Sequence, residues 1–106
     1  EIGDGSVWYI LPQIYYIIGA VHLERGNINL AEKNMQQTFE ESDAIYQIQG
    51  NAGRMAIYNA YGMEGLARVH LMRKEYTEAL DYAGKALVYA EEDGDIMVLA
   101  KILATL

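Results

Sequence analysis

A five-residue segment occurs twice in this chain, and the repetition constrains the fold more than any other feature of the sequence. Residues 21–25 read Val-His-Leu-Glu-Arg and residues 69–73 read Val-His-Leu-Met-Arg, so four of the five positions are identical at an offset of 48. The same offset relates similar residues further out, namely Tyr15 and Met63, Ile18 and Leu66, Gly19 and Ala67, Ile28 and Tyr76, and Ala31 and Ala79. A fixed period of roughly 20–50 residues is typical of repeat proteins, in which one supersecondary unit stacks on the next.

The spacing of apolar residues predicts helices along the whole chain and no strand. We expect five helices, at about residues 7–25, 29–49, 52–73, 76–92 and 96–106. Residues 50–51 and 93–95 interrupt the pattern, with Gly94 suited to a left-handed position after a helix and Asp95 suited to an N-cap. Because the connections are short, neighbouring helices should pack antiparallel.

Small residues recur at equivalent positions of the two copies and predict close helix crossings. Gly19 and Ala67 lie in the first helix of each pair, and Ala31 and Ala79 lie in the second. Small side chains let helix axes approach to about 8–10 Å. One such pair cannot bury all its apolar surface, so pairs must stack. The sequence therefore predicts an all-α fold of stacked antiparallel helix pairs.

This arrangement resembles the tetratricopeptide repeat (TPR) family. The residues that carry the resemblance are Tyr15, Ile18, Gly19, His22, Ala31 and Met35 in the first copy, and Met63, Leu66, Ala67, His70, Ala79 and Ala83 in the second. The offset of 48 exceeds the family's usual 34 residues by about two helical turns in each helix, and no proline ends the second helix. Longer repeats of this kind resemble those of bacterial regulatory proteins, including sensor kinases.

The resemblance implies a right-handed α-solenoid of about two and a half repeats. Residues 1–106 would form one TPR-like domain, with repeat one at about 7–49, repeat two at about 52–92 and the start of a third at 95–106. The chain opens on Glu1 and ends within an apolar helical pattern. We therefore expect it to be a fragment of a longer protein.

The resemblance also implies a concave groove lined by the first helix of each pair. Carried over by position, the groove residues are Gln13, Tyr16, Ala20 and Glu24 in the first copy, and Tyr61, Glu64, Arg68 and Met72 in the second. Tyrosines suit peptide binding because they give large contact area at low entropic cost, although ordinary packing between repeats explains Tyr16 and Tyr61 equally well. The family's carboxylate clamp needs Lys and Asn at such positions. Glu64 stands where a cation would help, which disfavours an acidic C-terminal peptide.

Composition excludes several classes of site. The chain has no cysteine, which removes disulfides, zinc–thiolate sites and thiol nucleophiles. Its formal net charge is −7, which disfavours nucleic acid and favours a basic or neutral partner.

No residue pattern points to catalysis, a cofactor or a metal, so we expect no enzyme activity. His22 and His70 lack the spacing of a metal pair on one helix, and we expect both to be half-buried in a helix seam. The acidic clusters at 40–43 and 91–95 read as solvated helix ends.

Residues 5–23 carry no formal charge, but Pro12, Gln13 and His22 interrupt the run. We predict a buried repeat helix there and no membrane insertion. The last helix is also apolar, with a predicted stripe of Ile96, Leu99, Leu103 and Leu106. An array needs polar ends, so we expect these helices to be covered by further repeats or by a second copy of the chain.

These patterns predict a protein–protein or protein–peptide interaction scaffold in a larger bacterial signalling or regulatory protein. A ligand-sensing helical domain, binding a small molecule or peptide between helices, remains the alternative. We expect a cytoplasmic location, with the periplasm left open.

Overall fold

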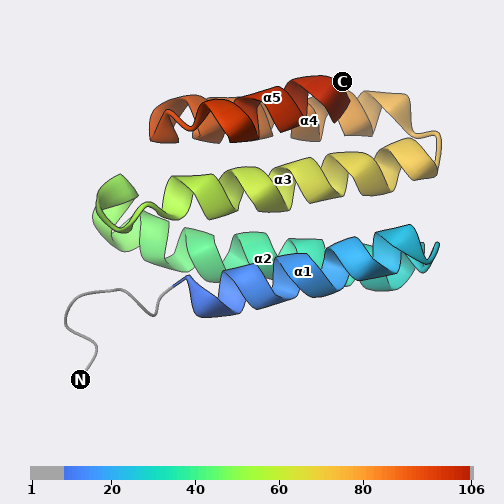
Figure 1. The fold of residues 1–106 in the computed structure, drawn as a ribbon, viewed down its shortest axis with the longest axis horizontal. Helices are drawn as coiled ribbons and strands as arrows, with labels where there is room; N and C mark the ends of the chain where they lie inside the picture. Colours follow the sequence, from blue (N-terminus) through green and yellow to red (C-terminus); the bar gives the residue numbers. More distant parts are fainter. Residues whose placement is uncertain (1–8, 106) are drawn as a thin grey trace.

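The computed structural model describes residues 9–105 and confirms an all-α fold (Figure 1). Its helices are α1 (Ile10–Glu24), α2 (Ile28–Gln49), α3 (Met55–Met72), α4 (Tyr76–Asp93) and α5 (Ile96–Thr105). Each runs antiparallel to the one before it (Figure 1). The predicted start at Val7 and the predicted stripe residue Leu106 lie outside the described residues.

The central element is α3, which packs against all four other helices. Figure 1 shows α1 in front of α2 and α5 in front of α4, with α3 between the two pairs. Because α3 also contacts both α1 and α5, these three helices share one face of the molecule, which we call the α1–α3–α5 face. All five helices contribute to one core, formed by Leu23, Ala31, Met35, Ala60, Met63, Leu66, Val69, Ala86, Ala90, Val98 and Ile102.

Glycines set the closest helix approaches. A Cβ atom added to Gly19 would lie 3.0 Å from Cε of Met35, and one added to Gly65 would lie 2.2 Å from its Sδ. The Met35 side chain of α2 therefore occupies the space left by the missing side chains of Gly19 on α1 and Gly65 on α3. Gly62 likewise admits the backbone of Phe39, at 3.0 Å from the added Cβ to the Phe39 nitrogen. The predicted close crossing of α1 and α2 is present, with Gly19 facing Met35, one turn beyond Ala31.

The two copies of the repeat end their first helix in the same backbone motif. The residue after the C-cap is left-handed in both, with φ of 77° at Gly26 and 62° at Lys74. In α1, the Asn27 nitrogen donates to the His22 carbonyl and the Gly26 nitrogen to Leu23. The residues 48 positions later make the same two bonds after α3. This paired pattern is a Schellman motif, so the repeat is present in the backbone as well as in the sequence.

The connections at the other end of the molecule differ from the expected ones in one respect. The third helix begins at Met55 and not at about 52, because residues 50–53 form a 3-10 turn and Arg54 adopts a left-handed conformation with φ of 59°. The turn after α4 is confirmed. Gly94 is left-handed at φ 81°, and Asp95 caps α5 by accepting from the Met97 nitrogen at 2.9 Å.

The prediction that the first helix is buried is wrong for its outer side. Pro12, Gly19 and Leu23 are buried, but the opposite side of α1 exposes a row of large apolar residues, namely Ile10, Leu11, Ile14, Ile17, Ile18 and Val21. Pro12 is compatible with the helix because it lies in the first turn, where no backbone N–H partner is needed. No helix between residues 9 and 105 is long and apolar enough to cross a membrane.

Of the predicted stripe of α5, Leu99 is half-buried against the core, whereas Ile96 and Leu103 face away from it. Val98 and Ile102 are buried, whereas Ile96 is 76% exposed and Leu103 is 59% exposed. An almost entirely apolar helix has more than one apolar row, so periodicity alone could not decide which row would pack.

Candidate binding surface

Tyrosines from α1 and α3 meet on the α1–α3–α5 face. The ring centroids of Tyr16 and Tyr61 lie 4.9 Å apart with a tilt of 41°, and Tyr58 lies 6.0 Å from Tyr61. Tyr9 stacks on Tyr58 at 6.3 Å. The two tyrosines predicted for the groove are therefore brought together, and they extend into a row of four aromatic rings.

A buried carboxylate lies beneath this row, contrary to the prediction that Glu64 faces the groove. Its side chain is 1% exposed. Oε1 accepts a 3.2 Å hydrogen bond from the Tyr16 hydroxyl, and Oε2 accepts a 3.1 Å bond from the Thr105 hydroxyl. Nε of Arg68 lies 3.7 Å from Oε2. Glu64 is buried because α5 places Thr105 over it. The two copies of the repeat contain no helix equivalent to this contact of α5, so their comparison could not predict the burial.

The environment of Tyr16 favours its neutral form. Burial raises the pKa of the Tyr16 phenol above its usual value of 10.0, and the negative charge of Glu64 raises it further. The phenol is therefore a stable hydrogen-bond donor to the carboxylate at neutral pH.

Sequence reasoning missed Lys101, which completes the site from α5. Its Nζ lies 4.8 Å from the centroid of the Tyr16 ring and 5.6 Å from that of Tyr61. The same ammonium group donates a hydrogen bond to the Tyr16 hydroxyl. The offset of 48 maps Lys101 onto Gly53, so the repeat carried no signal for it.

The predicted groove residues divide between two clefts. Gln13, Tyr16 and Tyr61 line the first, which has a volume of about 310 Å³ and which we call the tyrosine cleft; its other lining residues are Ile17, Ile57, Tyr58 and Lys101. Glu24, Arg68 and Met72 line the second, of about 340 Å³, together with Leu23 and Leu71. Ala20 is half-buried and packs against the core.

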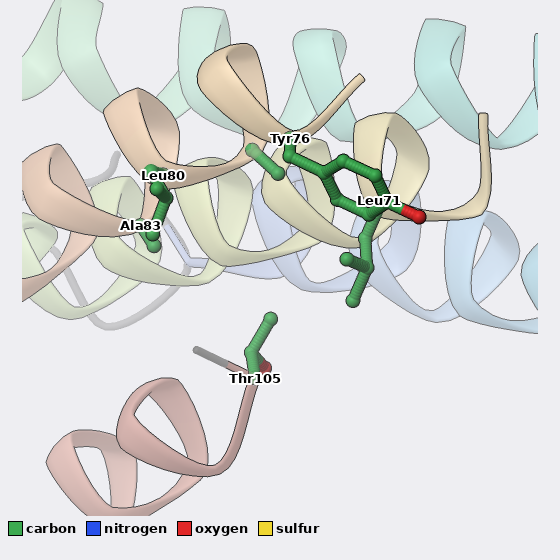
Figure 2. A pocket seen from close by; sticks show the side chains of 6 residues that line it. Leu71, Tyr76, Leu80, Ala83 and Thr105 are labelled. Atoms are coloured by element: carbon green, nitrogen blue, oxygen red, sulfur yellow. The ribbon is translucent and has the colours of Figure 1, made fainter. Parts of the chain in front are cut away.

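Two further clefts lie elsewhere. A small one of about 170 Å³ is lined by Leu71, Tyr76, Ala79, Leu80, Ala83 and Thr105. Figure 2 shows Thr105 at the end of α5, across from Leu80 and Ala83 of α4. Tyr76, the residue 48 positions after Ile28, is 59% exposed here. The larger one, of about 450 Å³, lies between α2, α3 and α4 and is lined by Gln36, Phe39, Met63, Leu66, Tyr82, Lys85 and Tyr89.

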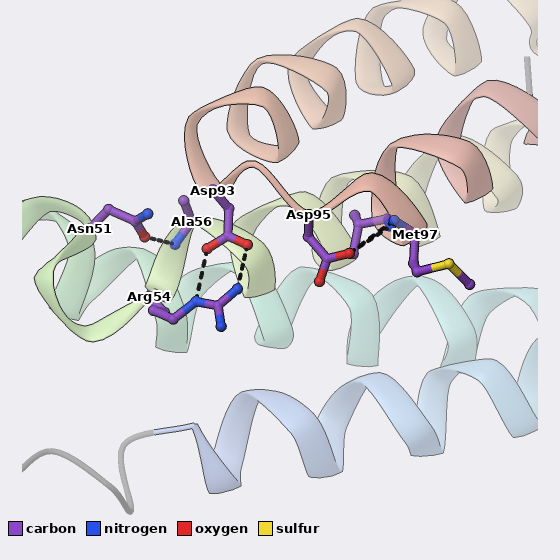
Figure 3. A network of polar contacts seen from close by, with 7 residues as sticks. Asn51, Arg54, Ala56, Asp93, Asp95 and Met97 are labelled. Carbon is purple, nitrogen blue, oxygen red and sulfur yellow. Dashed lines mark hydrogen bonds and ion pairs between the residues drawn. The ribbon is translucent and has the colours of Figure 1, made fainter.

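The acidic cluster at the end of α4 is partly structural, which corrects its assignment to the surface. Asp93 accepts two hydrogen bonds from Arg54, at 3.2 Å from Nε and 2.8 Å from Nη2, and its side chain is 1% exposed (Figure 3). Glu92 accepts from the Tyr46 hydroxyl. The left-handed backbone at Arg54 directs its guanidinium to Asp93, so these contacts join the α2–α3 connection to the end of α4.

Both histidines are half-buried, as predicted, and His70 lies in the predicted kind of helix seam, against Tyr82 of α4. Nδ1 of His70 lies 2.7 Å from Oε1 of Glu75, and its ring stacks on Tyr82 at 5.2 Å. Nδ1 of His22 lies 3.4 Å from the side-chain amide of Asn27, the position equivalent to Glu75. Across the part of the chain that the structure describes, no three His, Cys, Asp or Glu side chains gather in a way that could hold a metal ion.

Comparison with known protein families, with curated proteins and with solved structures finds no match to this chain. The structure is a compact five-helix all-α domain.

Proposed function

We propose that this chain is a TPR-like interaction module that binds a peptide or a protein segment on its α1–α3–α5 face. The observation that carries the proposal is the row of tyrosines together with two clefts on the same face, which are lined by six of the eight predicted groove residues. Tyr9 is exposed, and Tyr16, Tyr58 and Tyr61 are half-buried. Tyrosine is enriched among the residues that anchor protein interfaces. A net charge of −7 favours a basic or neutral partner.

The stacking of two equivalent helix pairs supports the TPR-like part of the proposal. The Schellman motif shared by the two copies and the glycine contacts at Met35 support a solenoid of about two and a half repeats. In this proposal, the chain serves as the scaffold of a larger bacterial signalling or regulatory protein in the cytoplasm and carries out no reaction itself.

A photo-crosslinking experiment tests the binding face. A photoreactive amino acid would replace Gln13 or Met72, which are exposed on the face, and Val88, which is exposed on α4, as the control. We expect a partner to be captured from the first two positions only. A Tyr61→Ala/Met72→Ala variant should lose that partner, whereas an Ile48→Ala/Val88→Ala variant should retain it. Capture from Val88, or retention by the first variant, would contradict the proposal.

Cleft volume favours a ligand-sensing domain as a second candidate. Small-molecule sites are commonly about 300–1,000 Å³, and the clefts of 310 and 450 Å³ fall within that range. A ligand bound only to the native state would raise the melting temperature. A thermal-shift screen against metabolites separates the two candidates, because a protein partner would leave that screen without a hit.

We also propose that the outer side of α1 mediates self-association. Leu11, Ile14, Ile18 and Val21 form its exposed row, at alternating intervals of three and four residues. This is the spacing of a helix-pairing seam. At the opposite edge of the fold, α5 exposes Ile96, Met97 and Leu103 (Figure 1). In the proposed contact, the exposed row of α1 in one copy packs against the exposed apolar residues of α5 in a second copy.

A further inference from the structure

The tyrosine cleft already holds a cation. Lys101 reaches from α5 so that its ammonium lies within 6 Å of two ring centroids, at 4.8 Å from Tyr16 and 5.6 Å from Tyr61. Tyrosine faces attract cations at this range because the π-electron cloud is negative. Since the Lys101 side chain is exposed, these contacts are open to exchange.

The hydrogen bonds around Tyr16 leave an acceptor in the cleft that is suited to a cation. The Tyr16 hydroxyl donates to Oε1 of Glu64, so its oxygen lone pairs remain available to accept from an ammonium group. Two cations lie near this site and are already engaged. Arg68 lies 3.7 Å from Glu64, and Arg54 forms a two-bond pair with Asp93. Burial raises the pKa of Tyr61, and the negative charges of Asp95, Glu64 and Asp93 raise it further.

We propose that the tyrosine cleft binds a lysine or arginine side chain of a basic partner segment, and that Lys101 is an internal occupant which the partner's cation displaces. This inference rests on the proposed interaction function and names the chemistry that the face recognises. The volume of about 310 Å³ lies at the low end for ligand sites, and it fits one long side chain. The net charge of −7 adds long-range attraction for such a segment.

Self-occupancy has a measurable consequence. A partner cation binds only the fraction of molecules in which Lys101 has left the rings, and this weakens the apparent affinity by that fraction. Removing the Lys101 charge should therefore strengthen binding of a cationic peptide, although it also makes the protein more negative. A matched control for the charge is Lys85→Gln, because Lys85 lies 5.2 Å from the Tyr82 ring and outside the tyrosine cleft.

The test uses two probe peptides, acetyl-Gly-Ser-Lys-Ser-Gly-amide and its counterpart with norleucine in place of lysine, titrated by NMR. We expect Lys101→Gln to bind the lysine peptide roughly three- to tenfold more tightly than the wild type. The Lys85→Gln variant should bind the lysine peptide with the same affinity as the wild type. The norleucine peptide should bind none of the three proteins. Equal affinity of wild type and Lys101→Gln, or equal binding of both peptides, would overturn the inference.

A second measurement does not depend on a variant. The ring currents of Tyr16 and Tyr61 should shift the side-chain ε protons of Lys101 upfield in the wild type, and the lysine peptide should reverse that shift. Ordinary lysine shifts, unchanged by the peptide, would refute the internal occupant. If crosslinking at Gln13 and Met72 still captures a partner whose basic residues are dispensable, the interaction function stands and the cation site is rejected.

Discussion

The hydroxyl of Tyr16 on α1 donates a 3.2 Å hydrogen bond to Oε1 of Glu64 on α3, and the two residues are separated by 48 positions, the offset of the repeat. They are equivalent positions of the two copies. Stacking thus brings a position of one copy against its own counterpart in the next. In this pair the first copy provides the donor and the second provides the acceptor.

We expect Glu64→Leu to lower the free energy of unfolding by about 1–3 kcal/mol, because the half-buried Tyr16 hydroxyl would lose its acceptor and the Thr105 hydroxyl would keep only the Lys101 carbonyl. Glu64→Gln keeps an acceptor oxygen and should cost less. Chemical denaturation measures both. A Tyr16→Phe/Glu64→Leu double variant should be less destabilised than the sum of the single variants, and strict additivity would show that the bond contributes nothing.

The glycine crossing at Met35 gives a second prediction. An alanine at Gly65 would place its Cβ 2.2 Å from Sδ and 2.6 Å from Cγ of Met35, which is fully buried. Overpacking of this kind costs about 1–3 kcal/mol, more than alanine gains in helix propensity. Gly84→Ala is the control, because nothing lies within 4 Å of its added Cβ.

This control on α4 should stabilise the protein by about 0.5–1 kcal/mol, since glycine weakens a helix interior. The two changes have the same chemistry and opposite expected signs. Thermal and urea denaturation compare them directly. A Gly65→Ala variant as stable as Gly84→Ala would mean that Met35 moves aside freely.

The repeated turn predicts a stabilising substitution. Lys74 holds a left-handed conformation, at φ 62°, where the first copy has Gly26. A non-glycine residue pays about 1 kcal/mol for that conformation. Lys74→Gly should therefore stabilise the protein by about 0.5–1 kcal/mol, and Gly26→Ala should destabilise it by about 1 kcal/mol.

Urea midpoints at an unchanged slope would measure both turn variants. Neither substitution removes a side chain that packs in the core. Destabilisation by Lys74→Gly would argue against the Schellman geometry after α3.

Alkaline pH should unfold the protein through its tyrosines. Burial raises the pKa of Tyr16, and the hydrogen bond to Glu92 raises the pKa of Tyr46 to about 12. Since both folded-state values lie above the unfolded value of 10.0, their contribution to stability is complete below pH 10 and is lost as the pH rises toward the folded values. Because the pKa values of Tyr58, Tyr61 and Tyr89 are also raised by burial, we expect all five of these tyrosines to ionise only above pH 10, together with loss of helix.

Phenolate absorbance and circular dichroism, followed through one titration, test this order of events. The Tyr46→Phe variant should lack one of the late-ionising groups. Ionisation of all the tyrosines in a single step near pH 10, with the helices intact, would contradict the prediction.

Much of the helix layout follows from the sequence because it is set locally. The Gly94 turn and the Asp95 cap depend on residues next to them, and the 48-residue offset carries the antiparallel pairing from one copy to the other. The contact of Tyr16 with Tyr61 was predictable for the same reason, since both positions belong to the repeat.

The rest depends on α5 and on turn geometry. The burial of Glu64 and the position of Lys101 require α5 to cross α3, and neither copy of the repeat contains an equivalent contact. The burial of Asp93 requires a left-handed arginine at the start of α3, which no residue preference signals. Long-range partners of this kind are set by tertiary packing.

The exposed row on α1 gives the last prediction. Leu11, Ile14, Ile18 and Val21 have the three–four spacing with which helices pair, so two glutamates there should abolish self-association. Sedimentation velocity over a range of concentrations should show the wild type associating and an Ile14→Glu/Ile18→Glu variant remaining monomeric. Ile48→Glu is the control, because Ile48 is 87% exposed on α2 and lies outside the row. If both variants behaved alike, association would depend on net charge and not on this helix face. A wild type that stayed monomeric at high concentration would remove the basis for the proposed contact between copies.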